Sequence, residues 1–95
     1  MQQLQELIER FRKERGWDQT DTPSILVKSI FVEASELLEC DQFAEETTDL
    51  EALKSELADV LMYSLSLCYD LKLDPYAIIA EKLVDVAKRY PKVQL

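Results

Sequence analysis

Hydrophobic residues recur at helical spacing along nearly the whole chain. Near the N-terminus they follow the i, i+3, i+4, i+7 pattern of an amphipathic helix, at Leu4, Leu7, Ile8 and Phe11. Two later segments begin with a capping side chain followed by Pro at the first helical position, at Thr22-Pro23 and Asp74-Pro75. Another begins where Thr48 to Glu51 has the S/T-x-x-E form of a capping box. The pattern predicts four helices, over about residues 2–15, 23–39, 49–72 and 75–90.

The segments between these helices predict short connections. Residues 17–22 are polar apart from Trp17 and are interpreted as a loop, as is the acidic segment 40–49. Four helices with short connections predict an all-α fold, a four-helix antiparallel bundle formed by residues 1–95 as a single domain. In the last helix we expect one apolar face to be buried, formed by Tyr76, Ile79, Leu83, Val86 and Tyr90. We expect so short a chain to complete its core by dimerising.

The second predicted helix carries a charged residue where apolar residues belong. The centre of its apolar stripe is formed by Leu26, Ile30 and Leu37. Glu33 falls among them on a helical wheel, and Glu36 lies at the edge of the stripe. A carboxylate on a core-facing line is costly unless it is paired or bound to a metal. The next helix repeats the spacing with Glu56 and Asp59.

The two acidic pairs together predict a metal site. Residues i and i+3 share a helix face, so each pair offers two carboxylates to one point. If the two helices lie side by side, the four groups converge and repel one another unless a cation binds between them. Oxygen ligands without His or Cys favour Mg²⁺, Mn²⁺ or Ca²⁺. Such an ion activates water and stabilises charge on a phosphate, and Lys82, at the margin of the last helix, is placed to neutralise a phosphate.

Composition excludes several classes of partner and of catalytic site. The formal charge of −8 argues against nucleic acid and against an anionic membrane surface. The absence of His excludes a Ser-His or Cys-His nucleophile, and the single Gly excludes glycine-rich phosphate loops. The sequence has no apolar run of the roughly 20 residues that span a membrane. Two widely separated cysteines, Cys40 and Cys68, fit reduced thiols and a cytoplasmic location.

A second interpretation of the same residues is structural. In a chain with 19 acidic residues, pairs spaced three apart arise easily on solvated helix faces. Lys82 at a helix edge is typical of a side chain that keeps its ammonium group in water. For Trp17, a place in the core is the ordinary expectation, and for Tyr63 and Asp70 the structural interpretation is favoured. The position of Glu33 on the apolar stripe, and the repeat of the pair on the next helix, favour the metal site.

The order of these motifs resembles a known family. The acidic pairs, the second within an ELADVLMY stretch, resemble those of the MazG-type all-α nucleoside triphosphate pyrophosphohydrolases. FRKERGWDQ (residues 11–19) is similar to the N-terminal FxxERxWxQ stretch of their short, dCTP-pyrophosphatase-like branch. Lys82, followed by Arg89-Tyr90-Pro91, is similar to the C-terminal K…(R/K)YP signature. The resemblance covers nearly the whole chain.

The resemblance implies an activity and a role for each residue. It implies Mg²⁺-dependent cleavage of a nucleoside triphosphate between the α- and β-phosphates, which clears non-canonical or surplus nucleotides. The residues that would hold the metal or orient the attacking water are Glu33, Glu36, Glu56 and Asp59. Lys82 would contact phosphate, and Trp17 would line the base pocket. The family also implies a homodimer or a dimer of dimers.

Three departures from the family pattern limit what the resemblance implies about the substrate. Asp21 and Ile25 stand where the branch commonly has His and Asn, and Val86 stands where the C-terminal signature has Asn. The lost groups are polar and suited to binding base, sugar or phosphate, so base preference does not carry over. Two alternatives stay open: a homologue that binds nucleotide or a partner without cleaving it, and a member acting on phosphoribosyl-ATP or nucleoside diphosphates.

Overall fold

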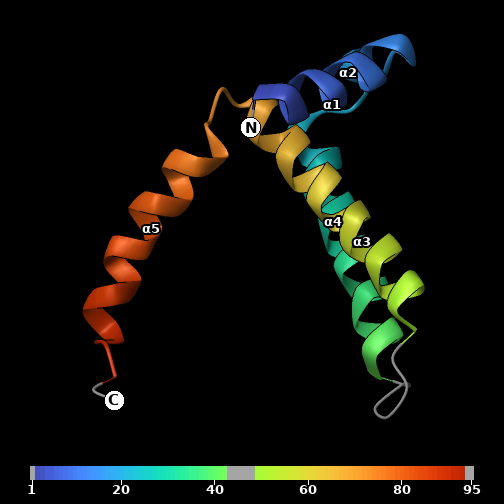
Figure 1. The fold of residues 1–95 in the computed structure, drawn as a ribbon. Coiled ribbons are helices and arrows are strands. Elements are labelled where there is room, and N and C mark those ends of the chain that lie inside the picture. Colours follow the sequence, from blue (N-terminus) through green and yellow to red (C-terminus); the bar gives the residue numbers. More distant parts are fainter. Residues whose placement is uncertain (1, 43–48, 94–95) are drawn as a thin grey trace.

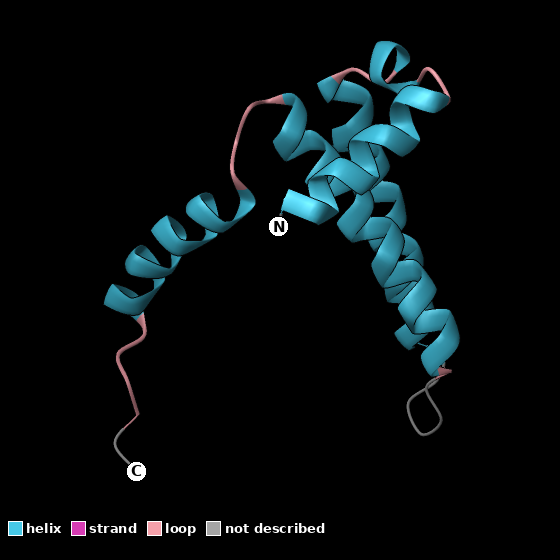
Figure 2. Ribbon diagram, turned by 45° about the horizontal axis from the view of Figure 1, so that its top comes forward, coloured by secondary structure: helices cyan, strands magenta, loops and turns pink. Residues whose placement is uncertain are grey.

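The chain folds into helices joined by short turns (Figure 1). The computed structural model describes residues 2–42 and 49–93. In chain order the helices are α1 (Gln2–Glu14), α2 (Trp17–Thr20), α3 (Pro23–Gln42), α4 (Leu50–Asp70) and α5 (Pro75–Arg89). In Figure 2 the described residues form only helices and loops. The expected all-α class is therefore confirmed. None of the described helices combines the length and the apolar character needed to cross a membrane.

Helix ends follow the capping signals, with two corrections. Thr22 and Asp74 accept backbone N–H bonds from Ile25 and Tyr76, at 3.2 and 3.1 Å, as their positions before Pro predicted. At the start of α4 the cap is Asp49, whose carboxylate accepts from the N–H groups of residues 51 and 52. The expected capping residue, Thr48, lies outside the described residues.

The second correction concerns the segment expected to be a loop. Residues 17–20 form the single helical turn α2, which starts directly after Gly16. The φ of Gly16 is 73°, in the left-handed region that a residue without Cβ adopts most readily. The chain thereby turns sharply after α1, and the carbonyl of Gly16 accepts the N–H of Gln19 at 3.1 Å. Polar composition alone did not reveal this turn.

Helices α3 and α4 form an antiparallel hairpin, and α1 crosses the second half of α4 (Figure 1). The bidentate ion pair between Arg12 of α1 and Asp70 of α4 fixes this crossing, with N···O distances of 3.0 and 2.9 Å. Among the described residues, the buried hydrophobic side chains of the core are Ile8, Leu26 and Tyr69. The hairpin with α1 therefore has only a small core of its own.

Helix α5 does not pack on the other helices. It leaves the end of α4 and runs away from the hairpin (Figures 1 and 2). The face that we expected to be buried is exposed in the single chain: Tyr76 is 72%, Ile79 57% and Leu83 58% accessible. The four-helix antiparallel bundle is therefore not closed within one chain. The amphipathic pattern of α5 was recognised correctly, but its packing partner is absent from the chain's own fold.

Candidate metal centre

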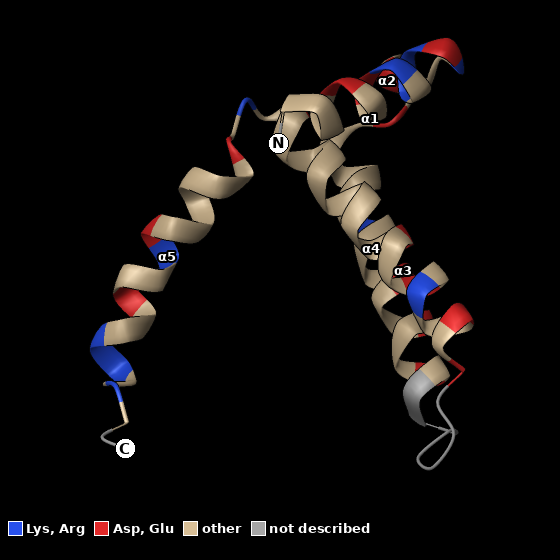
Figure 3. Ribbon diagram, in the orientation of Figure 1, with Lys and Arg blue, Asp and Glu red and all other residues tan. Residues whose placement is uncertain are grey.

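The hairpin brings the two acidic pairs together. Glu33 on α3 and Glu56 and Asp59 on α4 each place one carboxylate oxygen within 4.8 Å of the other two. In each pair the three-residue spacing turns both side chains to one helix face, and antiparallel packing sets the two faces opposite each other. Figure 3 shows acidic positions on both helices of the hairpin, whereas residues 60–69 of α4 carry no charged side chain. The predicted convergence of carboxylates therefore occurs in the fold.

Burial distinguishes this cluster from a solvated acidic face. Glu33, Glu56 and Asp59 are half-buried, and Oε2 of both Glu33 and Glu56 is buried with no hydrogen-bond partner among the described residues. A buried carboxylate oxygen without a donor is costly. Hard divalent cations take several oxygen ligands of this kind. The donor set and its unsatisfied oxygens therefore fit an ion such as Mg²⁺ or Mn²⁺.

The same crowding shifts the proton equilibria of the cluster. Burial, then hydrogen bonding with Glu36, then the charges of Glu36, Asp59 and Glu56 raise the pKa of Glu33 from 4.5 to about 7. Burial, followed by the charges of Glu36 and Asp59, raises the pKa of Glu56. Glu36 is exposed and contributes to raising both of these pKa values, while the carboxylate oxygens that lie within 4.8 Å of one another are those of Glu33, Glu56 and Asp59. Without a cation, the cluster favours protonation over a fourfold negative charge.

Comparison with known proteins places this cluster in a family. The model of the MazG-like family matches residues 28–94, which include all four carboxylates and Lys82. The chain belongs to the MazG-like family. The mouse protein "dCTP pyrophosphatase 1" is 31% identical over 101 residues, covering 96% of this chain. The chain spans 59% of the length of that relative.

A solved structure has the same fold. A pyrophosphatase from Archaeoglobus fulgidus matches with a TM-score of 0.83 and 34% sequence identity. The match covers 97% of this chain and 93% of the archaeal one, so it takes in the hairpin and α5 alike. The family membership and this fold agree with the resemblance drawn from the motifs.

Tyr63 lies one helical turn after Asp59 on α4, although the sequence pattern favoured only a structural role for it. Burial, then the charges of Glu33, Asp21 and Asp59, raise the pKa of its hydroxyl. Tyr63 also lines a small cavity of about 10 Å³ together with Trp17, Asp21 and Ser66. The sequence could have indicated this position, because Tyr63 follows Asp59 by four residues and residues i and i+4 share a helix face.

Trp17 lines the same small cavity as Tyr63. Its indole packs edge-on against Phe11, with ring centroids 5.6 Å apart, and is 38% exposed. Asp21, one of the departures from the family pattern, shares the cavity with it. The predicted base-binding residue and the departing carboxylate therefore lie on the same side of the hairpin as Tyr63.

Lys82 is not brought to the cluster within one chain. It lies exposed on α5, which runs away from the hairpin (Figure 1). Asp70, by contrast, has the structural role expected of it, because its carboxylate binds the guanidinium of Arg12. The structure thus brings Glu33, Glu56 and Asp59 together, places Trp17 beside Tyr63, and leaves Lys82 apart.

Proposed function

We propose that this chain is a Mg²⁺-dependent nucleoside triphosphate pyrophosphohydrolase. It would cleave a nucleoside or deoxynucleoside triphosphate between the α- and β-phosphates, giving a monophosphate and pyrophosphate. The observation that carries the proposal is the half-buried convergence of Glu33, Glu56 and Asp59 on two facing helices. The names of the mouse and archaeal relatives, a dCTP pyrophosphatase and a pyrophosphatase, support the reaction class.

The proposed roles follow from position and charge. Glu33, Glu36, Glu56 and Asp59 would hold the cation, and a carboxylate oxygen left free would orient the attacking water and accept its proton. When bound, the ion supplies a Lewis acid for the phosphate oxygens and lowers the pKa of water. Water oxygen would bond to the α-phosphorus while the bond to the bridging oxygen breaks, so that pyrophosphate leaves. Mn²⁺ has the same oxygen preference and would substitute.

Two further residues are proposed to bind substrate. Trp17 would stack on the base, a role supported by its partial exposure and by the cavity that it lines with Tyr63. Lys82 would neutralise phosphate charge. This role requires that α5 lie close to a carboxylate cluster. Removal of surplus or non-canonical nucleotides is the proposed biological role, in a homo-oligomer and in the cytoplasm.

Neutral isosteres of the carboxylates test the proposal. We expect Glu36→Gln and Asp59→Asn to lower the rate of pyrophosphate release by at least ~100-fold, because changes to the outer partners of metal ligands already cost ~10–100-fold. Pyrophosphate release would be measured with common and damaged nucleoside triphosphates, in Mg²⁺ and in Mn²⁺. Glu39→Gln is the matched control, since Glu39 is also exposed on α3 but points well away from the apolar stripe on a helical wheel. Release from no nucleotide would refute the proposal.

Binding of the ion is tested without turnover. A ligand that binds only the native state raises its stability by about 2.7 kcal/mol at a concentration of 100 times Kd. Thermal unfolding in MgCl₂ is compared with unfolding in NaCl at matched ionic strength, for the unaltered chain and for Asp59→Asn. An equal shift in the two salts would show that the acidic groups are merely screened. A Mg²⁺-specific shift without turnover would favour the alternative that the chain binds nucleotide or a partner without cleaving it. Release of phosphate or another product would favour phosphoribosyl-ATP or a nucleoside diphosphate as the substrate.

A further inference from the structure

Asp21 shares one face of the short helix α2 with Trp17. The N–H of Asp21 donates to the carbonyl of Trp17 at 2.9 Å, so the helical spacing continues to the residue that caps α2. Residues i and i+4 of a helix lie on the same face, and the two side chains line one small cavity. The carboxylate of Asp21 therefore lies on the same side of α2 as the indole that we proposed to stack on the base.

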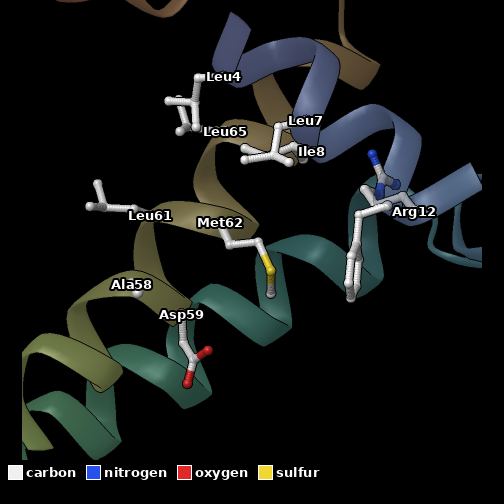
Figure 4. A pocket seen from close by; sticks show the side chains of 10 residues that line it. Leu4, Leu7, Ile8, Arg12, Ala58, Asp59, Leu61, Met62 and Leu65 are labelled. Carbon is white, nitrogen blue, oxygen red and sulfur yellow. The ribbon is translucent and has the colours of Figure 1, made fainter.

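The cavity that they share is the size of a single small group. Its volume is about 10 Å³, which is room for about one water molecule, and Tyr63 and Ser66 also line it. Arg12 and Met62 line this cavity and also the larger apolar groove between α1 and α4 that Figure 4 shows. A whole base does not fit in this space, whereas one amino group on the edge of a base does.

The oxygens of Asp21 are free to accept hydrogen bonds from a ligand. Asp21 is only partly exposed, and no donor in the described ranges 2–42 and 49–93 bonds to its carboxylate. Hydrogen bonding to Asp70 and then the charges of Asp70 and Asp21 raise the pKa of Arg12. Both terminal nitrogens of Arg12 are engaged by Asp70, however, at 3.0 and 2.9 Å. Arg12 therefore offsets the charge of Asp21 without occupying its oxygens.

Both side chains belong to segments that their neighbours hold in place. Trp17 packs edge-on against Phe11, and the guanidinium of Arg15 lies 3.5 Å from the centroid of the Phe11 ring. Asp21 is followed directly by Thr22, whose hydroxyl accepts a backbone N–H at 3.2 Å and caps α3. A group that is fixed before binding loses little conformational entropy when the ligand arrives.

A carboxylate distinguishes bases by the donors on their edges. When ionised it has two acceptor oxygens and no donor. Guanine carries two adjacent donors on its Watson–Crick edge, the N1–H and the N2 amino group. Cytosine and adenine carry one amino group beside a ring nitrogen that accepts, and thymine and uracil carry one N–H between two carbonyls. Among these bases, guanine alone therefore matches both oxygens of a carboxylate.

We propose that Asp21 makes the site selective for guanine nucleotides, its carboxylate accepting from the N1–H and the N2 amino group while Trp17 stacks on the ring. This assignment rests on the proposed function and names the substrate class for it. The N2 amino group enters the small cavity, where it replaces one water molecule. Any other common base turns an acceptor toward one oxygen of Asp21, or leaves that oxygen without a donor, which weakens binding.

Replacing the carboxylate by an amide should change the preferred base. In Asp21→Asn one acceptor oxygen becomes an NH₂ donor. The remaining oxygen still accepts the N1–H of guanine, but the new donor meets the N2 amino group. Xanthine has a carbonyl in place of that amino group, so xanthine matches the amide. We therefore expect Asp21→Asn to prefer dXTP to dGTP, a gain that damage to the fold does not produce.

Pyrophosphate release measures the preference. We expect kcat/KM for dGTP to exceed that for dITP, dATP, dCTP and dTTP by about 5- to 150-fold, the discrimination that a bidentate contact to a base gives. Comparison with dITP is the most direct, because hypoxanthine lacks only the N2 amino group. Asp18→Asn is the matched control and should keep the preference for dGTP: Asp18 is exposed on the same helix, but it does not line the cavity.

Three results of this assay would overturn the proposal. The first is an equal kcat/KM for dGTP and dITP, and the second is a preference of the unaltered chain for another base. The third is an Asp21→Asn chain that loses its activity on dGTP without gaining activity on dXTP. The third result would show that Asp21 supports the fold and does not contact the base.

Binding without turnover separates this proposal from the proposed function. Trp17 is the only Trp in the sequence, so its fluorescence reports on a base that stacks on it. In titrations without divalent cations, we expect the unaltered chain to bind dGMP more tightly than dIMP, and Asp21→Asn to bind dXMP more tightly than dGMP. This pattern without cleavage of any nucleotide would refute the proposed function and leave the base assignment standing. Cleavage without this pattern would refute the base assignment alone.

Discussion

The Arg12–Asp70 pair makes a quantitative prediction about what holds α1 to α4. The two N···O contacts are 3.0 and 2.9 Å long, and the side chain of Arg12 is only 6% exposed. Hydrogen bonding to Asp70 raises the pKa of Arg12. A guanidinium stays protonated even without such a partner, so the charge persists if Asp70 is replaced. Asp70→Asn therefore leaves a buried guanidinium without its counter-charge.

The magnitude follows from burial. Removing one partner of a fully buried pair costs about 3–5 kcal/mol. Asp70 is 30% exposed, so water screens part of the effect, and we expect the free energy of unfolding to fall by about 2–3 kcal/mol. Replacing both partners, with Arg12→Met and Asp70→Leu together, should recover most of the loss because no charge is left buried.

Urea unfolding followed by circular dichroism, at one fixed protein concentration, measures the change. The concentration is held constant because the stability of an oligomer depends on it. Glu51→Gln is the control: it breaks the Glu51–Lys54 pair, whose side chains are 80% and 72% exposed, and should cost at most about 0.5 kcal/mol. A loss for Asp70→Asn no larger than that of Glu51→Gln would refute the reasoning.

Two further predictions concern the cluster and a helix end. Without divalent cations the stability should fall as pH rises from 4.5 through about 7, because folded Glu33 keeps a proton that the unfolded chain has released. Glu33→Gln should flatten this dependence in urea unfolding at several pH values; a stability that rises over the same range would contradict the pKa shift. Asp49→Ala should cost about 1 kcal/mol by the same assay, since it removes the side-chain cap of α4. An unchanged midpoint for Asp49→Ala would show that the cap contributes nothing.

The helices and the acidic pairs were predictable from local patterns. Period, capping side chains and Pro gave helix bounds within a few residues of the observed ones, because these signals act over one or two turns. The turn α2 was missed, since its cause is a single left-handed residue, Gly16, within a polar segment. The partial burial of Glu33 was predictable too, because a helical wheel shows which face a residue shares.

Placement between helices depended on the tertiary fold. Nothing local indicates that Arg12 binds Asp70, 58 residues away, or that Tyr63 and Trp17 line one cavity. The sequence showed that α5 has an apolar face but not that its own chain leaves that face uncovered. Periodicity records which side of a helix avoids water, whereas the partner that covers it is set by turn geometry and by contacts between distant segments. For this chain, the sequence determined the helices and their acidic chemistry, and the tertiary structure decided which residues meet.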